Sequence, residues 1–342
     1  MSKQRSSMAL LQYALVLTVL VISSVVSRTS SPLIKKVFSG GVHLEGPHWS
    51  AKENALYWVD ITGQKVHRLD DETGNITIRE FGYGPVSLVV SVKDYSKMVL
   101  VAIRSELYLL NWDSCLGDGS LRLLSALDLG LPDNRCNDGK VDAKGRLWIG
   151  TIGREVNEVL DKDMATLYMV DAYNYAHPAD KLRPVSVSNG IAWTSDSKFM
   201  FYIDSPTRNI DVFDFVLEEG IIRNRRTLFS FQANNVTGVP DGMTIDSDGN
   251  LWVACYNGGK VIKIDSRAGR LLEQHTLKAS KVTSVMWGGH SLSTLYVTTS
   301  RRGLSPAELA QQPDAGSLFA IEGTGSKGLP ENQFYFPNAD SY

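Results

Sequence analysis

Four of six recurring segments of the sequence place a polar residue directly before glycine: Glu45-Gly46, Asp138-Gly139, Asn189-Gly190 and Asp241-Gly242. Glu45, Asn189 and Asp241 offer two carboxylates and one amide oxygen. Such an oxygen-only set suits Ca²⁺, Mg²⁺ or Mn²⁺, whereas Zn²⁺ more often recruits His or Cys. Asn-Gly and Asp-Gly are also strong tight-turn dipeptides, so each pair taken alone favours a turn over a ligand. A turn has no need of the glutamate at Glu45, and this favours a metal site.

The elements that would position these residues form a repeat of about fifty residues. Each copy contains two short apolar runs, and the second run ends near an acidic residue. The first runs are Ala55–Asp60, Lys97–Ala102, Gly145–Gly150, Lys198–Asp204, Gly249–Ala254 and Ser293–Thr298. The second runs are Lys65–Asp70, Glu106–Asn111, Thr166–Asp171, Ile210–Asp214, Lys260–Asp265 and Gly316–Glu322. This spacing is typical of one four-stranded sheet per repeat around a propeller axis.

The repeat predicts an all-β fold, a six-bladed β-propeller with four-stranded blades that spans residues 28–342 as a single domain. A β-sandwich is the alternative, but its strands have no reason to recur in six matching units. The polar-Gly dipeptides precede the first runs, on a shorter strand that would line the central channel. Glu45, Asn189 and Asp241 should therefore meet at an axial metal site. Residues 32–38 read as a further strand that closes the ring.

Composition excludes several classes of protein. The chain has 342 residues, of which 43% are hydrophobic, so it can bury a substantial core. Its 35 basic and 37 acidic residues give no one-sided positive charge, which argues against a nucleic-acid partner. Cys115, Cys136 and Cys255 are too few for a disulfide framework. The six histidines lack metal-ligand spacing, which favours surface or packing roles, and 246–250 reads as a hairpin turn.

The N-terminus has the pattern of a secretory signal peptide. Lys3 and Arg5 precede an apolar run over residues 8–26, and small residues follow it. We expect residues 1–27 to be removed by cleavage after Ser27, which would leave a protein that is secreted or held in the lumen of the secretory pathway, with no stable membrane association. An uncleaved signal anchor is the alternative. Sequons at Asn75 and Asn235 are compatible with secretion.

Five segments resemble one known family. They are Leu44–Trp49, Asn134–Lys140, Val187–Trp193, Val239–Asp246 and Asn250–Gly259. They are similar to the regucalcin (senescence marker protein 30), gluconolactonase and luciferin-regenerating enzyme family, and the resemblance covers about residues 40–328. It implies a six-bladed propeller with one divalent metal on the axis and, in many members, hydrolysis of sugar lactones.

When the motifs of the family are matched to this sequence, the resemblance implies metal ligands at Glu45, Asn189 and Asp241. It also implies substrate-binding residues at Arg135, Asn137 and Glu155. Cys136 stands where relatives carry a larger apolar residue, which predicts an altered pocket floor. The expected signal peptide departs from the pattern of the family, because regucalcins are commonly intracellular.

The resulting hypothesis is a metal-dependent, gluconolactonase-like hydrolase. Asp241 is the candidate catalytic base, the expected cofactor is Ca²⁺ with Zn²⁺, Mg²⁺ and Mn²⁺ as alternatives, and the substrate is a small sugar lactone. The alternative is a secreted calcium-binding protein, or a luciferin-regenerating or carrier-type relative, without lactonase turnover. Arg135 and Asn137 favour the enzyme, because calcium binding alone needs no substrate clamp.

Overall fold

The structure is a computed structural model. It describes residues 31–114, 120–156, 159–337 and 339. The expected signal peptide and Cys115 lie outside the described residues. None of the helices in the described part is long and apolar enough to cross a bilayer.

The described chain forms six four-stranded antiparallel sheets, which we call blades 1 to 6 in the order of their inner strands. The inner strands are β2 (Leu44–Ser50), β6 (Val86–Ser91), β10 (Arg135–Val141), β16 (Ser188–Trp193), β20 (Val239–Ile245) and β24 (Lys281–Gly288). The second strands are β3 (Ala55–Asp60), β7 (Met98–Ile103), β11 (Leu147–Ile152), β17 (Phe199–Asp204), β21 (Asn250–Tyr256) and β25 (Thr294–Ser300).

The outer half of each blade completes the sheet. The third strands are β4 (Lys65–Asp70), β8 (Glu106–Asn111), β14 (Ala165–Val170), β18 (Asn209–Val216), β22 (Lys260–Asp265) and β26 (Leu318–Glu322). The outermost strands are β5 (Ile76–Glu80), β9 (Arg122–Ala126), β15 (Ala179–Val185), β19 (Ile221–Ser230), β23 (Arg270–Thr276) and β1 (Leu33–Phe38). The predicted runs therefore correspond to the second and third strands, with ends shifted by a few residues.

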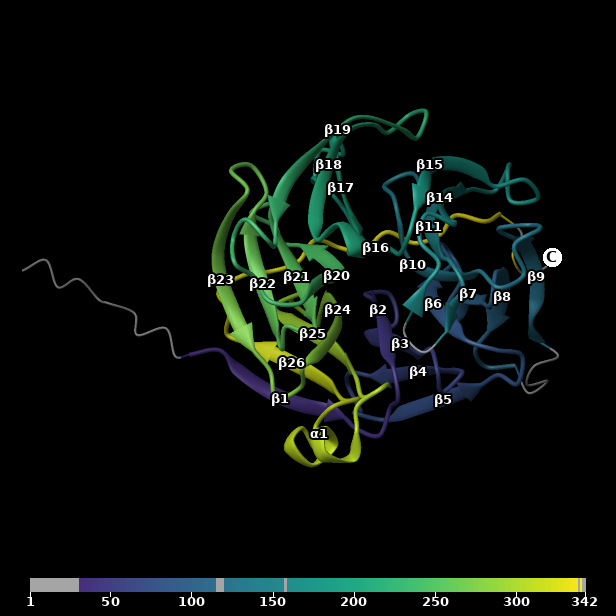
Figure 1. Cartoon of the computed structure of the whole chain (residues 1–342). Helices are drawn as coiled ribbons and strands as arrows, with labels where there is room; N and C mark the ends of the chain where they lie inside the picture. The colour runs from purple at the N-terminus through teal and green to yellow at the C-terminus, as the bar shows by residue number, and fades with distance from the viewer. Residues whose placement is uncertain (1–30, 115–119, 157–158, 338, 340–342) are drawn as a thin grey trace, which may run out of the picture. The chain divides into compact units, whose positions relative to one another are not determined.

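The blades close into a ring (Figure 1). Each inner strand contacts the inner strands of the two neighbouring blades, and β24 contacts β2. Strand β1, from the N-terminal side, pairs antiparallel with β26, from the C-terminal side, with Leu33 opposite Glu322. Both ends of the chain thus build blade 6, and no inner strand is left without a neighbour. The predicted six-bladed propeller and its closing strand are confirmed.

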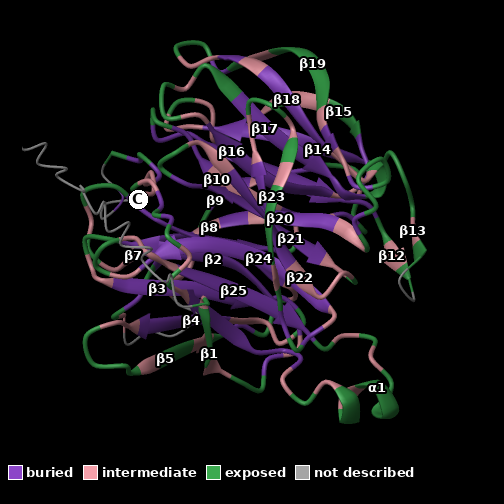
Figure 2. Ribbon diagram, turned by 90° about the vertical axis from the view of Figure 1, so that its left-hand side faces the viewer, coloured by how far each residue is buried: buried purple, intermediate pink, exposed green. Residues whose placement is uncertain are grey.

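Burial explains why the second strands read as continuous apolar runs. Strands β3, β11 and β21 are buried along almost their whole length because adjacent blades cover both of their faces. The outermost strands β5 and β23 are mostly exposed or half-buried (Figure 2). The cores between blades are therefore built mainly from the inner halves of the sheets.

Three small elements interrupt the blade pattern. Strands β12 (Glu155–Val156) and β13 (Val159–Leu160) form a two-stranded sheet within blade 3. A 3₁₀ turn covers Ser205–Thr207, and helix α1 covers Pro306–Gln311 after a capping box at Ser305. In Figure 2, β12, β13 and α1 all lie on the right-hand side of the propeller.

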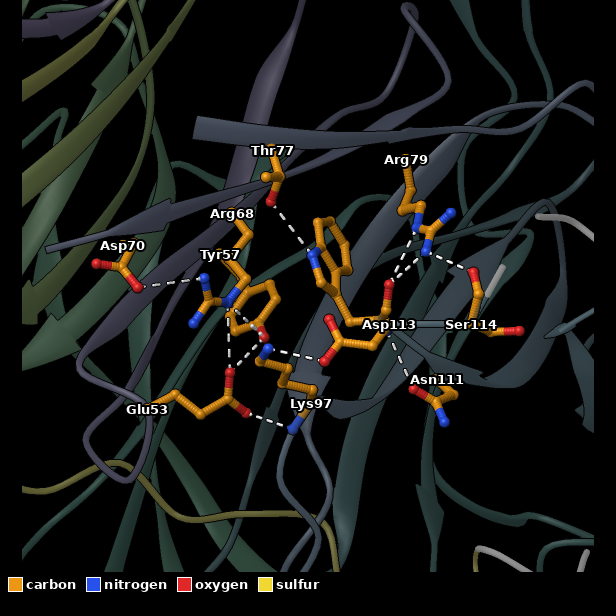
Figure 3. A network of polar contacts seen from close by, with 11 residues as sticks. Glu53, Tyr57, Arg68, Asp70, Thr77, Arg79, Lys97, Asn111, Asp113 and Ser114 are labelled. Carbon is orange, nitrogen blue, oxygen red and sulfur yellow. Dashed lines mark hydrogen bonds and ion pairs between the residues drawn. The ribbon is translucent and has the colours of Figure 1, made fainter. Parts of the chain in front are cut away.

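Polar contacts join blade 1 to blade 2 (Figure 3). The Nε atom of Arg68 donates to Tyr57 Oη at 3.1 Å and to Glu53 Oε2 at 3.4 Å. Glu53 Oε1 accepts a hydrogen bond of 2.7 Å from the backbone N–H of Lys97 in blade 2. The Arg68 and Glu53 side chains are 10% and 4% exposed, so water screens this ion pair little. The contact helps to fix blade 1, which carries Glu45.

The fold also bears on the predictions for the 246–250 turn, the cysteines and the sequons. Residues 246–250 form the turn between β20 and β21, as expected. Cys136 and Cys255 are free and buried. Cys136 packs in a core cluster with Leu88 and Leu107 and does not line the pocket described below, so the expected change to the pocket floor is wrong. Asn75 and Asn235 are both exposed.

Candidate metal centre and substrate pocket

The inner strands share an irregularity at one position. The register of each inner strand against its second strand shifts near one end, and in four of the six strands the polar-Gly dipeptide lies at this shift. The shifts lie between Glu45 and His48, Val86 and Leu88, Cys136 and Gly139, Ser188 and Ile191, Pro240 and Met243, and Val282 and Ser284. The dipeptides therefore sit in β-bulges, and reading them as tight turns would have been wrong. Bulges re-aim side chains and are frequent beside functional sites.

The glycines of these dipeptides allow neighbouring inner strands to approach closely. A Cβ on Gly190 would lie 2.8 Å from the carbonyl oxygen of Asp241, and a Cβ on Gly242 would lie 2.5 Å from the Cβ of Ser284. Gly46 also has φ +49°, in the region that favours glycine. These glycines thus allow the inner strands to pack closely around the axis. The side chain of the polar residue before each glycine can then act as a ligand or a catalytic group.

All six predicted site residues line one pocket with a volume of about 320 Å³. Glu45, Arg135, Asn137, Glu155, Asn189 and Asp241 come from five inner-strand or hairpin segments that are far apart in sequence. Ten further residues line the same pocket, among them His43, Ser205 and Arg302.

A directional chain of hydrogen bonds orients Asn189. Arg135, which can only donate, donates to Asn137 Oδ1 at 2.9 Å, so Asn137 Nδ2 faces Asn189 Oδ1, at 2.9 Å. At the other end, Ser205 Oγ donates to the Pro240 carbonyl at 2.6 Å and therefore accepts from Asn189 Nδ2, at 2.7 Å. The hydrogen bonds at the two ends of the Asn189 amide therefore give the same assignment of its oxygen and nitrogen atoms. That oxygen retains a lone pair for a ligand.

Glu45 and Asp241 are two of the three carboxylates that line the pocket, and each is 7% exposed. Glu45 Oε2 accepts one bond, from the N–H of Gly46 at 2.9 Å, and no described residue donates to the Asp241 carboxylate. Burial and the neighbouring Asp138 raise the pKa of Glu45 to about 8. Burial, then Glu45, raises the pKa of Asp241 well above its usual range. The charge of Arg135 opposes both shifts without cancelling them. Two buried carboxylates beside an oriented amide oxygen fit a divalent cation.

The described residues contain no group of three or more His, Cys, Asp or Glu side chains placed to hold a metal. The Asn189 oxygen is therefore the candidate third protein ligand, beside Glu45 and Asp241. Asp138, although it occupies the same position in its blade, lines a separate cavity of about 20 Å³ with Lys140 and Glu331. It acts on the pocket through its charge.

The side of the pocket formed by blades 3 and 6 is cationic. Arg302 donates from Nη1 to Glu155 Oε2 at 3.2 Å and from Nη2 to Glu155 Oε1 at 3.0 Å. Burial lowers the pKa of the Arg135 guanidinium, with Glu155 opposing the shift and Arg302 adding to it. Two guanidinium groups thus share one carboxylate in this part of the pocket.

His43 is a pocket residue that the sequence did not single out. Its Nδ1 lies 2.7 Å from Ser300 Oγ, and burial, then Arg135, Arg302 and Lys281, lower its pKa to about 3. The imidazole is therefore neutral at pH 7. Its position two residues before Glu45 is the signal that could have found it, because alternate residues of a strand share a face. No sequence pattern marks Ser205 or Arg302.

A family model described as "SMP-30/Gluconolactonase/LRE-like region" matches residues 44–301. The chain belongs to this family. All six predicted site residues lie inside the matched region, and Arg302 is the first residue beyond it.

Individual relatives agree with the family match. Regucalcin of Sus scrofa is 39% identical over 290 residues, which are 84% of this chain and 92% of that protein. A luciferin-regenerating enzyme has a solved structure with a TM-score of 0.82 and 30% identity, covering 89% of this chain and 100% of that one. A calcium-binding regucalcin from Agrobacterium tumefaciens has a TM-score of 0.79 at 22% identity, covering 89% of this chain and 97% of that one, and this likeness shows the fold alone.

Proposed function

We propose that this member of the SMP-30/gluconolactonase/LRE-like family is a metal-dependent hydrolase that opens sugar lactones. The observation that carries the proposal is the convergence of Glu45, Asp241 and the oriented Asn189 oxygen in a pocket that also holds Arg135. The donor set is all oxygen, which suits Ca²⁺, Mg²⁺ or Mn²⁺ better than Zn²⁺, and Ca²⁺ is the ion that we propose.

A divalent ion held by Glu45, Asn189 and Asp241 would polarise the lactone carbonyl and lower the pKa of a bound water. The Asp241 carboxylate accepts the proton that the attacking water gives up. The Arg135 guanidinium orients substrate hydroxyls or stabilises negative charge that develops on the carbonyl oxygen.

Asn137 and Glu155 complete the proposed substrate site in different ways. Both amide atoms of Asn137 are engaged, with Arg135 on one side and Asn189 on the other, so Asn137 acts mainly as a positioning residue. Glu155 is held by Arg302 and presents its carboxylate to the pocket. Glu155 is therefore the acceptor for sugar hydroxyl groups.

The test is the Asp241→Ala variant, with Asp248→Ala as its control. Asp248 is an exposed aspartate in the turn that follows the same strand. We expect Asp241→Ala to lose both stoichiometric metal and lactone hydrolysis while keeping the β-rich circular dichroism spectrum, since removing one carboxylate unbalances a site for a divalent ion. Asp248→Ala should keep both properties.

Retention of stoichiometric metal and near-native turnover by Asp241→Ala would contradict the proposal. Metal binding by the wild type without turnover of any lactone would support the calcium-binding or carrier role instead.

A further inference from the structure

A second hollow adjoins the candidate site. It has a volume of about 490 Å³ and shares Arg135, Glu155 and Arg302 with the pocket described above. Arg104 and Asp133 also line it. The Glu155–Arg302 ion pair therefore lies where the two hollows meet, and a molecule larger than one sugar ring can occupy both. We call the second hollow the arginine groove.

The backbone of Arg302 is held in place by buried side chains. Its N–H donates to Ser300 Oγ at 3.1 Å, and its carbonyl accepts from Lys281 Nζ at 2.7 Å. Ser300 and Lys281 are 0% and 5% exposed. The loop that carries Arg302 is thus fixed by the second and inner strands of blade 6, so its guanidinium is presented from a rigid base.

Arg104 reaches the groove from the turn between β7 and β8. Its N–H donates to the Pro85 carbonyl at 2.8 Å, and its own carbonyl accepts from the N–H of Cys136 at 2.7 Å, next to Arg135 in sequence. The stem of Arg104 passes over Gly84, where a Cβ would lie 2.7 Å from Arg104 Cγ. The absence of a side chain at Gly84 leaves room for the stem.

The arginine groove brings three guanidinium groups together with two carboxylates. Asp133 is exposed, and the Arg302 and Glu155 side chains are 32% and 20% exposed. The pair is bidentate and mostly buried, so Glu155 stays on Arg302, and an added anion meets a groove in which the guanidinium groups outnumber the carboxylates by one. Grouped arginines repel one another, and an anionic ligand relieves that repulsion. A neutral sugar would make no use of this excess of positive charge.

We propose that the arginine groove is a subsite for an anionic group, a carboxylate or a phosphate, on the part of the substrate remote from the reacting ester. The inference rests on the proposed lactonase function and specifies its substrate class as anionic sugar lactones. Arg302 binds the anion together with Arg104, and planar guanidinium groups suit both carboxylate and phosphate oxygens.

Two matched pairs of lactones test the proposal on the metal-loaded full chain. D-glucaro-1,4-lactone differs from D-glucono-1,4-lactone by a carboxylate, and 6-phospho-D-glucono-1,5-lactone differs from D-glucono-1,5-lactone by a phosphate. We expect the wild type to show a kcat/KM at least about tenfold higher for the anionic member of one pair, and this preference should weaken as salt is raised. The pair that shows it identifies the group.

The variants are Arg302→Gln and Arg104→Gln, with Arg301→Gln as the matched control. Arg301 is an exposed neighbour that lines neither hollow. We expect Arg302→Gln to lower the anionic-to-neutral ratio of kcat/KM about tenfold, Arg104→Gln to lower it by a smaller factor, and Arg301→Gln to leave it unchanged. A wild-type ratio near one in both pairs, or equal losses for both members in Arg302→Gln and Arg104→Gln, would overturn the proposal.

Binding of D-glucarate and D-gluconate, measured by calorimetry on the same metal-loaded proteins, separates this inference from the proposed function. These dianion and monoanion ligands differ only in the second carboxylate. If no lactone is hydrolysed, the lactonase proposal fails, yet tighter binding of D-glucarate that Arg302→Gln abolishes would still support the anion subsite. Equal affinities of D-glucarate and D-gluconate would refute a carboxylate subsite, and 6-phospho-D-gluconate compared with D-gluconate tests a phosphate subsite in the same way. Equal affinities in both comparisons would overturn the inference.

Discussion

Ser205→Ala removes the hydroxyl group that fixes one end of the Asn189 amide. In the structure, Ser205 Oγ accepts from Asn189 Nδ2 at 2.7 Å and donates to the Pro240 carbonyl at 2.6 Å. Asn189 is 5% exposed, so its Nδ2 would be left buried without an acceptor. The amide can then rotate and direct its N–H groups towards the place where the proposed ion binds, which a cation would not tolerate.

The size of the effect follows from two independent magnitudes. Loss of a residue that orients a metal ligand typically weakens metal binding about 10- to 100-fold, or roughly 1.4 to 2.8 kcal/mol. A buried donor left without a partner costs about 1 to 3 kcal/mol, which is the same range. We therefore expect Ca²⁺ affinity to fall by about this factor, and the free energy of unfolding of the metal-free protein to fall by at most about 3 kcal/mol.

Calorimetric titration of metal-stripped protein with Ca²⁺ measures the effect directly. Ser50→Ala is the matched control, because Ser50 is 2% exposed on the inner strand β2 and its Oγ has no hydrogen-bond partner among the described residues. Ser50→Ala should bind Ca²⁺ as the wild type does. If folded Ser205→Ala also binds with wild-type affinity, the argument that Ser205 orients Asn189 is refuted.

Three further predictions concern other parts of the chain. Arg135→Ala should keep stoichiometric metal and lose about tenfold or more in kcat/KM on the best lactone, the scale of one charged hydrogen bond; unchanged kinetics would remove Arg135 from the site. Burial lowers the pKa of His67 to about 4, below its unfolded value of 6.5, so stability that is complete above pH 6.5 is lost as the pH falls towards 4. The loss reaches about 2 kcal/mol by pH 5, and urea unfolding of His67→Phe at pH 7 and pH 5 should show a correspondingly smaller decrease than the wild type; an equal decrease would count against it. We also propose that the mature protein begins near Arg28 and is secreted, which N-terminal sequencing from expressing cells checks; an intact Met1 in cytosolic protein would contradict it.

Much of the propeller could be predicted from the sequence because each blade repeats a local pattern. Second strands such as β3 and β21 are covered on both faces, and this burial produces continuous apolar runs that stand out in a single sequence. Closure by β1 was also predictable, since Leu33–Phe38 is a strand left over after six pairs of runs. The convergence of Glu45, Asn189 and Asp241 followed from their shared position in the repeat.

The remainder depends on contacts that no local pattern encodes. Asn189-Gly190 lies in a bulge, with Gly190 close against the neighbouring inner strand, whereas the dipeptide by itself indicates a turn. Ser205 enters the pocket from a 3₁₀ turn after β17, and Arg302 enters it from a loop after β25, so neither shares the position of the predicted ligands. Their roles appear only when blades distant in sequence are placed side by side.

The most direct test of the central claim is hydrolysis of D-glucono-1,5-lactone and its anionic analogues by metal-stripped wild-type protein, before and after reloading with Ca²⁺, Mg²⁺, Mn²⁺ or Zn²⁺. The proposal predicts no turnover above the uncatalysed rate after stripping, and recovery with at least one ion in proportion to the metal bound, up to one ion per chain. Full activity of the stripped protein, or no hydrolysis of any lactone with any of the four ions bound, would contradict the claim that this pocket is a metal-dependent lactonase site.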